Sequence, residues 1–105
     1  MELDELLKKF KEYSTQDTTV LEYAWNYASE SHKGQKRASG EDYFIHPAAV
    51  AEILVDYKMD LETIAAGLLH DVLEDTSIPH ETFKKEFGDE IYNLVAGVTK
   101  IETLK

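Results

Sequence analysis

The 105-residue chain contains no cysteine, which excludes disulfide scaffolds, zinc–thiolate sites and cysteine nucleophiles. It has no long apolar run, because the longest, residues 64–69, is far shorter than the roughly 20 residues that span a bilayer. Its acidic first residues are unlike a signal peptide. Positive charge is also scarce, because the chain has 11 Lys and Arg residues but 21 Asp and Glu residues. The resulting net charge of −10 disfavours binding to bare nucleic acid or an anionic membrane. We therefore expect a cytoplasmic protein.

The apolar content is high enough for folding. A hydrophobic fraction of 43% and an aromatic fraction of 10% exclude a disordered chain, and the length suits one small domain. Apolar residues recur with a helical period, so we expect an all-α bundle of about six short helices. The expected helices cover residues 2–13, 18–32, 47–57, 61–74, 79–87 and 89–100. Pro47 would occupy the first position of the third helix, Asp60 would cap the fourth, and Gly88 would end the fifth.

The expected fourth helix, reaching about Glu74, combines a core face with a polar stripe. Steps of 100° per residue put six apolar residues on one face: Ile64, Ala65, Leu68, Leu69, Val72 and Leu73. A neighbouring arc of about 140° holds four ionisable residues: His70, Asp71, Glu74 and Asp75. Thr63 and Gly67 lie on the same stripe, and their small size leaves room for another group to approach.

The polar stripe has two interpretations. It is either solvated acidic surface with a structural histidine, or a cation site. Three carboxylates near a helix C-terminus repel one another and oppose the helix dipole, so a divalent metal ion among them is the simplest counter-charge. Imidazole and carboxylate ligands favour Mn²⁺, Fe²⁺ or Zn²⁺ over Ca²⁺.

A metal ion needs a further ligand from another part of the chain. His46 is the best candidate, because the following Pro47 should hold its backbone extended and fix its side-chain direction. His32, at the end of the second expected helix, is the second choice and would otherwise cap carbonyl groups. His80 has polar neighbours and is expected at the surface.

The loop of residues 31–43 concentrates basic charge in an acidic chain. Lys33, Lys36 and Arg37 lie within five positions, and glycines and Ser39 flank them. Flexible backbone with Lys and Arg suits phosphate or a nucleotide base. Alternatively, the loop is solvated and its charges are balanced by nearby acidic residues, namely Glu30, Glu41 and Asp42.

Three stretches resemble one enzyme family: residues 32–47 (HKGQKRASGEDYFIHP), 63–76 (TIAAGLLHDVLEDT) and 87–101, with FG followed by LVAGVTKI. Together they resemble the hydrolase domain of RelA/SpoT-type enzymes, including its HD and ED motifs, over residues 17–101. The resemblance implies an all-helical HD fold. It also implies Mn²⁺-dependent removal of the 3′-pyrophosphate from the guanosine nucleotides ppGpp and pppGpp.

Position by position, the resemblance implies roles for eight residues. His46, His70 and Asp71 would bind the metal, and Glu74 and Asp75 would position and activate the attacking water. Arg37 and Ser39, with Lys36 beside them, would bind the nucleotide.

The sequence departs from the family pattern in two places. Ala38 replaces a frequent lysine, which would weaken one nucleotide contact. The family's later Asp-Arg-Leu-His-Asn type motif has no counterpart, so the fourth protein ligand and the C-terminal helices would be missing. We therefore expect residues 1–105 to form a single partial HD domain from a longer enzyme, with surface open to self-association.

The sequence leaves three functions as hypotheses. The first is the ppGpp hydrolase, and the second is an HD phosphohydrolase acting on another nucleotide. The third is a catalytically inactive helical interaction module. Metal binding and a substrate panel separate the three.

Overall fold

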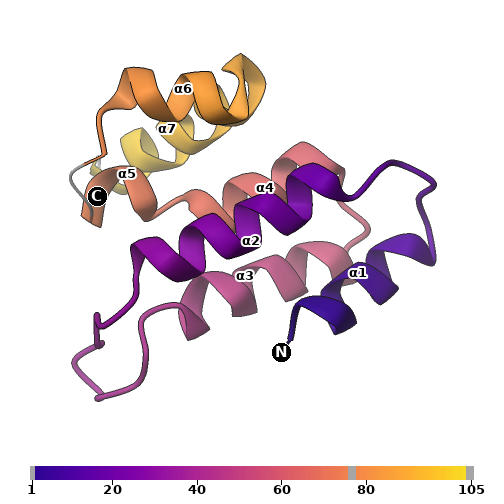
Figure 1. Cartoon of the computed structure of the whole chain (residues 1–105), viewed down its shortest axis with the longest axis horizontal. Helices are drawn as coiled ribbons and strands as arrows, with labels where there is room; N and C mark the ends of the chain where they lie inside the picture. The colour runs from indigo at the N-terminus through magenta and orange to yellow at the C-terminus, as the bar shows by residue number, and fades with distance from the viewer. Residues whose placement is uncertain (1, 76–77, 104–105) are drawn as a thin grey trace.

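The computed structural model describes the backbone of residues 2–75 and 78–103, and their side chains except those of residues 74, 75 and 98–103. Within these ranges the chain forms seven helices, and the only β-type pairing is an isolated bridge between Lys36 and Asp42. The helices are α1 (Leu3–Lys11), α2 (Thr19–Ser31), α3 (Ile45–Asp56), α4 (Leu61–Leu69), α5 (Val72–Asp75), α6 (His80–Phe87) and α7 (Asp89–Thr103). The all-α prediction is confirmed (Figure 1).

Helix α4 is the centre of the bundle. It packs against α2, α3 and α7, while α1 lies along α3 and α6 pairs with α7 (Figure 1). The six apolar residues that the sequence places on the core face of the fourth expected helix are all buried. Ala66 and Gly67, outside that face, are buried as well, because neighbouring helices enclose α4 on several sides.

Two helix boundaries follow the sequence closely. The Asp60 carboxylate accepts a hydrogen bond from the backbone N–H of Thr63 at 2.9 Å and caps α4. The hydroxyl and the backbone N–H of Thr63 both hold the pKa of Asp60 below its ordinary value. At the end of α6, Gly88 adopts φ +89°, a conformation that glycine adopts without strain. Both predicted boundaries are confirmed.

The third helix begins earlier than predicted. Helix α3 starts at Ile45, so Pro47 is its third residue and His46 lies inside its first turn rather than in an extended segment. The first four N–H groups of a helix have no carbonyl partner within the helix, so a proline at this position removes no helical hydrogen bond. The expected extended backbone at His46 is therefore wrong.

The fourth predicted helix is two helices. Helix α4 ends at Leu69, His70 and Asp71 form a turn, and α5 starts at Val72. In an uninterrupted helix the Gly67 carbonyl would accept the N–H of Asp71. The His70 ring Nδ1 lies 2.7 Å from this same carbonyl oxygen, at the point where the helix is interrupted.

Side-chain contacts fix the outer helices. The Lys9 ammonium on α1 lies 3.3 Å from the Glu52 carboxylate and 3.1 Å from that of Asp56, both on α3. The Tyr23 hydroxyl on α2 donates to Glu86 on α6. In the described part of the chain, no helix combines the length and the apolar character needed to cross a membrane.

Candidate metal centre

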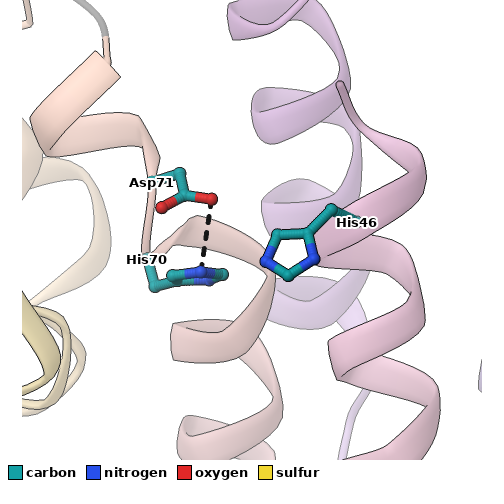
Figure 2. Close-up of side chains that lie close together, drawn as sticks. All are labelled: His46, His70 and Asp71. Atoms are coloured by element: carbon teal, nitrogen blue, oxygen red, sulfur yellow. Dashed lines mark ion pairs between the residues drawn. The ribbon is translucent and has the colours of Figure 1, made fainter. Parts of the chain in front are cut away.

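Three predicted ligands meet between α3 and the turn that follows α4. One donor atom from each of His46, His70 and Asp71 lies within 4.8 Å of the others. Figure 2 shows the three side chains converging, with His46 on α3 and the other two on the α4–α5 turn. The imidazole centroids are 5.6 Å apart, and their planes meet at 69°. The structure therefore brings together the imidazole and carboxylate groups that were paired from the sequence.

The hydrogen bond of His70 fixes which ring nitrogen faces the centre. A carbonyl oxygen only accepts hydrogen bonds, so Nδ1 must donate to the Gly67 oxygen, 2.7 Å away. In the neutral ring, Nε2 then carries a lone pair, and it lies 3.2 Å from Oδ2 of Asp71. Two facing acceptors repel each other unless a cation lies between them.

The donor set fits a divalent metal ion. His70 and Asp71 are 8% and 7% exposed, so little water screens the contact between Nε2 and the carboxylate. His46 adds a second imidazole nitrogen within reach. Two imidazoles and one carboxylate suit first-row transition metals, and the Nδ1–H to carbonyl bond is the usual outer contact of a metal-binding histidine.

Gly67 allows the close approach of α3 to α4 on which the site depends. A Cβ atom at this position would lie 2.6 Å from Cδ1 of Leu54 and 3.3 Å from Cγ1 of Val50, both on α3. The space that we expected beside Gly67 is therefore filled by the side chains of α3. The glycine brings the helix carrying His46 towards His70.

Tyr43 makes a contact that the sequence motifs did not reveal. Its hydroxyl donates to Oδ2 of Asp71 at 3.1 Å, and its backbone carbonyl accepts the N–H of His46 at 3.1 Å. The sequence offered one indication that Tyr43 lies near the site, namely its position three residues before the candidate ligand His46.

His32, the second-choice ligand, is outside the metal-type group found among the described side chains. The His32 residue is 2% exposed, and its ring stacks on that of Tyr43 with centroids 4.7 Å apart. Nδ1 of His32 lies 3.0 Å from the side-chain oxygen of Gln35, while Nε2 is buried and has no hydrogen-bond partner in the part of the chain that the structure describes. His80 is exposed, as expected, and its Nδ1 lies 3.0 Å from the Tyr92 hydroxyl.

The basic loop is closed by short-range contacts. The Arg37 N–H donates to the Glu41 carbonyl at 2.9 Å, and the Gly40 N–H donates to the Arg37 carbonyl at 2.8 Å. Lys36 forms an ion pair with Asp42, and the Ser39 hydroxyl donates to Glu41 at 3.3 Å. Of the loop's three basic residues, only Lys36 is paired with a neighbouring acid among the described residues, so the alternative in which acids balance the loop is matched for this residue. The Arg37 side chain is exposed and has no ion pair among the described residues.

Glu74 and Asp75 were predicted to act on the attacking water. Their backbone belongs to α5, but their side chains lie outside the described residues.

Comparison with known proteins gives close matches. A guanosine-3′,5′-bis(diphosphate) 3′-pyrophosphohydrolase of Aquifex aeolicus is 46% identical over 103 residues, covering 98% of this chain and 15% of that protein. A protein of the same name from Vibrio cholerae is 44% identical over 103 residues, covering 97% and 15%. The bifunctional (p)ppGpp synthase/hydrolase SpoT of Escherichia coli is 47% identical over 85 residues, covering 81% and 12%.

The chain spans about 15% of the length of the first two of these curated relatives. The predicted resemblance to RelA/SpoT-type enzymes is confirmed at this level of identity. The family model for the HD domain matches residues 24–105, which include the His70-Asp71 pair and His46. This match covers most of the chain, and the chain belongs to the HD-domain family.

Proposed function

We propose that this chain carries a divalent-metal hydrolase centre that removes the 3′-pyrophosphate from guanosine 3′,5′-bis(diphosphate). The proposal rests mainly on one observation: Nε2 of His70, Oδ2 of Asp71 and a ring nitrogen of His46 converge within metal-ligand reach. The substrate comes from the names of the relatives that match nearly the whole chain. The metal in this proposal is Mn²⁺, one of the ions that suits two imidazoles and a carboxylate.

The proposed metal ion would be held by three side chains and one supporting backbone contact. His46, His70 and Asp71 would hold the ion, and the Gly67 carbonyl would keep the His70 ring in the binding tautomer. When bound, a divalent ion lowers the pKa of a coordinated water and neutralises a phosphate oxygen.

The proposed proton transfers use the acidic pair of α5. Glu74 would accept a proton from the attacking water, whose oxygen forms a new bond to phosphorus. The bond from phosphorus to the 3′ oxygen then breaks, and Asp75 would assist protonation of that leaving oxygen. The products are pyrophosphate and GDP from ppGpp, or pyrophosphate and GTP from pppGpp.

The basic loop supplies the proposed nucleotide contacts. The Arg37 guanidinium is exposed, and its planar shape suits a base or a phosphate. Lys36 and Ser39 would have to exchange their contacts with Asp42 and Glu41 for contacts with the nucleotide. We therefore expect Arg37 to contribute more to nucleotide affinity than these two residues.

Metal binding by the chain itself is the first test. We expect Mn²⁺ titration by calorimetry to show one site, which His70→Ala and Asp71→Ala abolish while His80→Ala retains it. His80 is the matched control because it is an exposed histidine outside the metal-type group. Unchanged Mn²⁺ binding in His70→Ala would show that the ligand assignment is wrong.

Hydrolysis is the second test. With ppGpp, pppGpp and a panel of other nucleotides, we expect Mn²⁺-dependent release of pyrophosphate from ppGpp and pppGpp. Release only from another nucleotide would support a different HD phosphohydrolase. A dimer in sedimentation without bound metal would support the interaction module. Self-association, the single partial domain over residues 1–105 and a cytoplasmic location stay predictions.

A further inference from the structure

Tyr43 contacts both elements that supply the metal ligands. Its backbone carbonyl accepts the N–H of His46 at 3.1 Å, in the turn that starts α3. Its hydroxyl donates to Oδ2 of Asp71 at 3.1 Å, on the turn after α4. Asp71 follows Tyr43 by 28 positions, so this hydrogen bond joins distant parts of the chain. One residue thus connects the two sides of the candidate centre.

The hydroxyl acts on the oxygen that faces His70. Oδ2 of Asp71 is also the atom 3.2 Å from Nε2 of His70. A carboxylate oxygen has two lone pairs, so a hydrogen bond from Tyr43 occupies one and leaves the other for a metal ion. Because the Asp71 side chain is only 9% exposed, water is a poor substitute for this donor.

The Tyr43 ring is itself held in place. It stacks on the buried His32 ring, with centroids 4.7 Å apart and planes at 28°. His32 is in turn hydrogen-bonded through Nδ1 to the side chain of Gln35, whose backbone carbonyl accepts the Tyr43 N–H at 3.0 Å. Tyr43 therefore ends the basic loop and is tied back to its start through Gln35. Its hydroxyl reaches from this loop to Asp71.

We propose that Tyr43 is a positioning residue that orients the Asp71 carboxylate for metal binding and couples the basic loop to the metal centre. This inference rests on the proposed function, because it assumes that Asp71 is a ligand. Its chemical basis is the role of residues that hydrogen-bond to a metal ligand. Removing a group that orients a ligand carboxylate typically lowers metal affinity by about 10–100-fold.

Tyr43→Phe tests the proposal, because it removes the hydroxyl and keeps the ring that stacks on His32. We expect Mn²⁺ affinity, measured by calorimetry on the full chain, to fall by about 10–100-fold. Tyr13→Phe is the matched control: it also loses a hydroxyl hydrogen bond, to the Met59 carbonyl at 2.8 Å, which joins the segments that follow α1 and α3. We expect this control to bind Mn²⁺ like the wild type.

Thermal unfolding without metal separates positioning from general stability. We expect the two phenylalanine variants to lose similar small amounts of Tm without Mn²⁺, and only Tyr43→Phe to lose part of the Tm increase caused by Mn²⁺. If Tyr43→Phe binds Mn²⁺ within about threefold of the wild type, the proposal is wrong while the metal centre stands. If the wild type binds no Mn²⁺, the proposed function fails first and this inference fails with it.

A measurement on the wild type covers the case in which Tyr43→Phe does not fold. With tyrosines labelled at Cζ, addition of diamagnetic Zn²⁺ should shift the carbon signal of Tyr43 and leave that of Tyr57, which is 77% exposed, unchanged. An unshifted Tyr43 signal in the Zn²⁺-bound protein would overturn the proposal.

Discussion

Replacing Gly67 by alanine tests the link between helix packing and the metal centre. The new Cβ would lie 2.6 Å from Cδ1 of Leu54 and 3.3 Å from Cγ1 of Val50. Ordinary carbon contacts are about 3.5–4.0 Å, so roughly 1 Å of movement is needed on the Leu54 side. Val50 is β-branched and stiff at χ1, so we expect part of this movement to be a displacement of α3.

Two opposing terms set the size of the effect on stability. Alanine is favoured over glycine inside a helix by about 1 kcal/mol. Overpacking typically costs about 1–3 kcal/mol. The sum predicts a Gly67→Ala variant between unchanged and about 2 kcal/mol less stable.

Gly97 on α7 provides the matched control. A Cβ there would meet no atom of the described residues within 4 Å, so Gly97→Ala should gain the full helix preference of about 1 kcal/mol. The two variants should differ by about 1–3 kcal/mol, and 1 kcal/mol corresponds to about 4–8 °C in Tm for a domain of roughly this size. Urea unfolding followed by circular dichroism measures the same difference as a free energy.

Metal affinity reports on the displacement of α3. Ligand distances in metal sites hold within about 0.2 Å, so a shift of α3 that carries His46 should weaken Mn²⁺ binding in Gly67→Ala and leave it unchanged in Gly97→Ala. The double variant Gly67→Ala with Leu54→Ala removes the closest contact and should recover affinity. If Gly67→Ala is as stabilising as Gly97→Ala and binds Mn²⁺ normally, α3 and α4 do not pack through this glycine.

Two further predictions concern stability alone. Asp60→Ala should lower the free energy of unfolding by about 0.5–2 kcal/mol, whereas Asp60→Asn keeps a capping oxygen and should lose less. Since the pKa of Asp60 is lowered in the folded chain, its charge-dependent stabilisation is present above the ordinary pKa of 3.8 and disappears as the pH falls through the lower folded value. The advantage of wild type over Asp60→Asn in urea unfolding should therefore vanish in acid, and a persistent advantage would contradict the capping argument. Leu68→Ala, in the fully buried face of α4, should cost about 2–5 kcal/mol in the same assay, and a cost below about 1 kcal/mol would contradict the central position of this helix.

Much of the fold is predictable from residue spacing, because each helix of this bundle buries a stripe of apolar residues. The apolar face of α4, the Asp60 cap and the Gly88 stop are local features that need no knowledge of the neighbouring helices. The grouping of His46 with the His70-Asp71 pair was expected on two grounds: the shortage of counter-charge around clustered carboxylates, and the resemblance to RelA/SpoT-type enzymes. Which histidine completes the group depends on the packing of α3, and the spacing of residues within one helix does not encode this.

The break at His70 shows why spacing alone fails at the site. Val72 and Leu73 are buried and continue the apolar period of α4, so the sequence pattern gives no sign of an interruption. At this interruption Nδ1 of His70 donates to the Gly67 carbonyl, the acceptor that an uninterrupted helix would use for the N–H of Asp71. The same bond directs Nε2 towards the Asp71 carboxylate. The interruption of the helix and the ring orientation suited to a metal ion therefore coincide at one residue, a histidine whose Nδ1 reaches back to a glycine carbonyl three residues earlier.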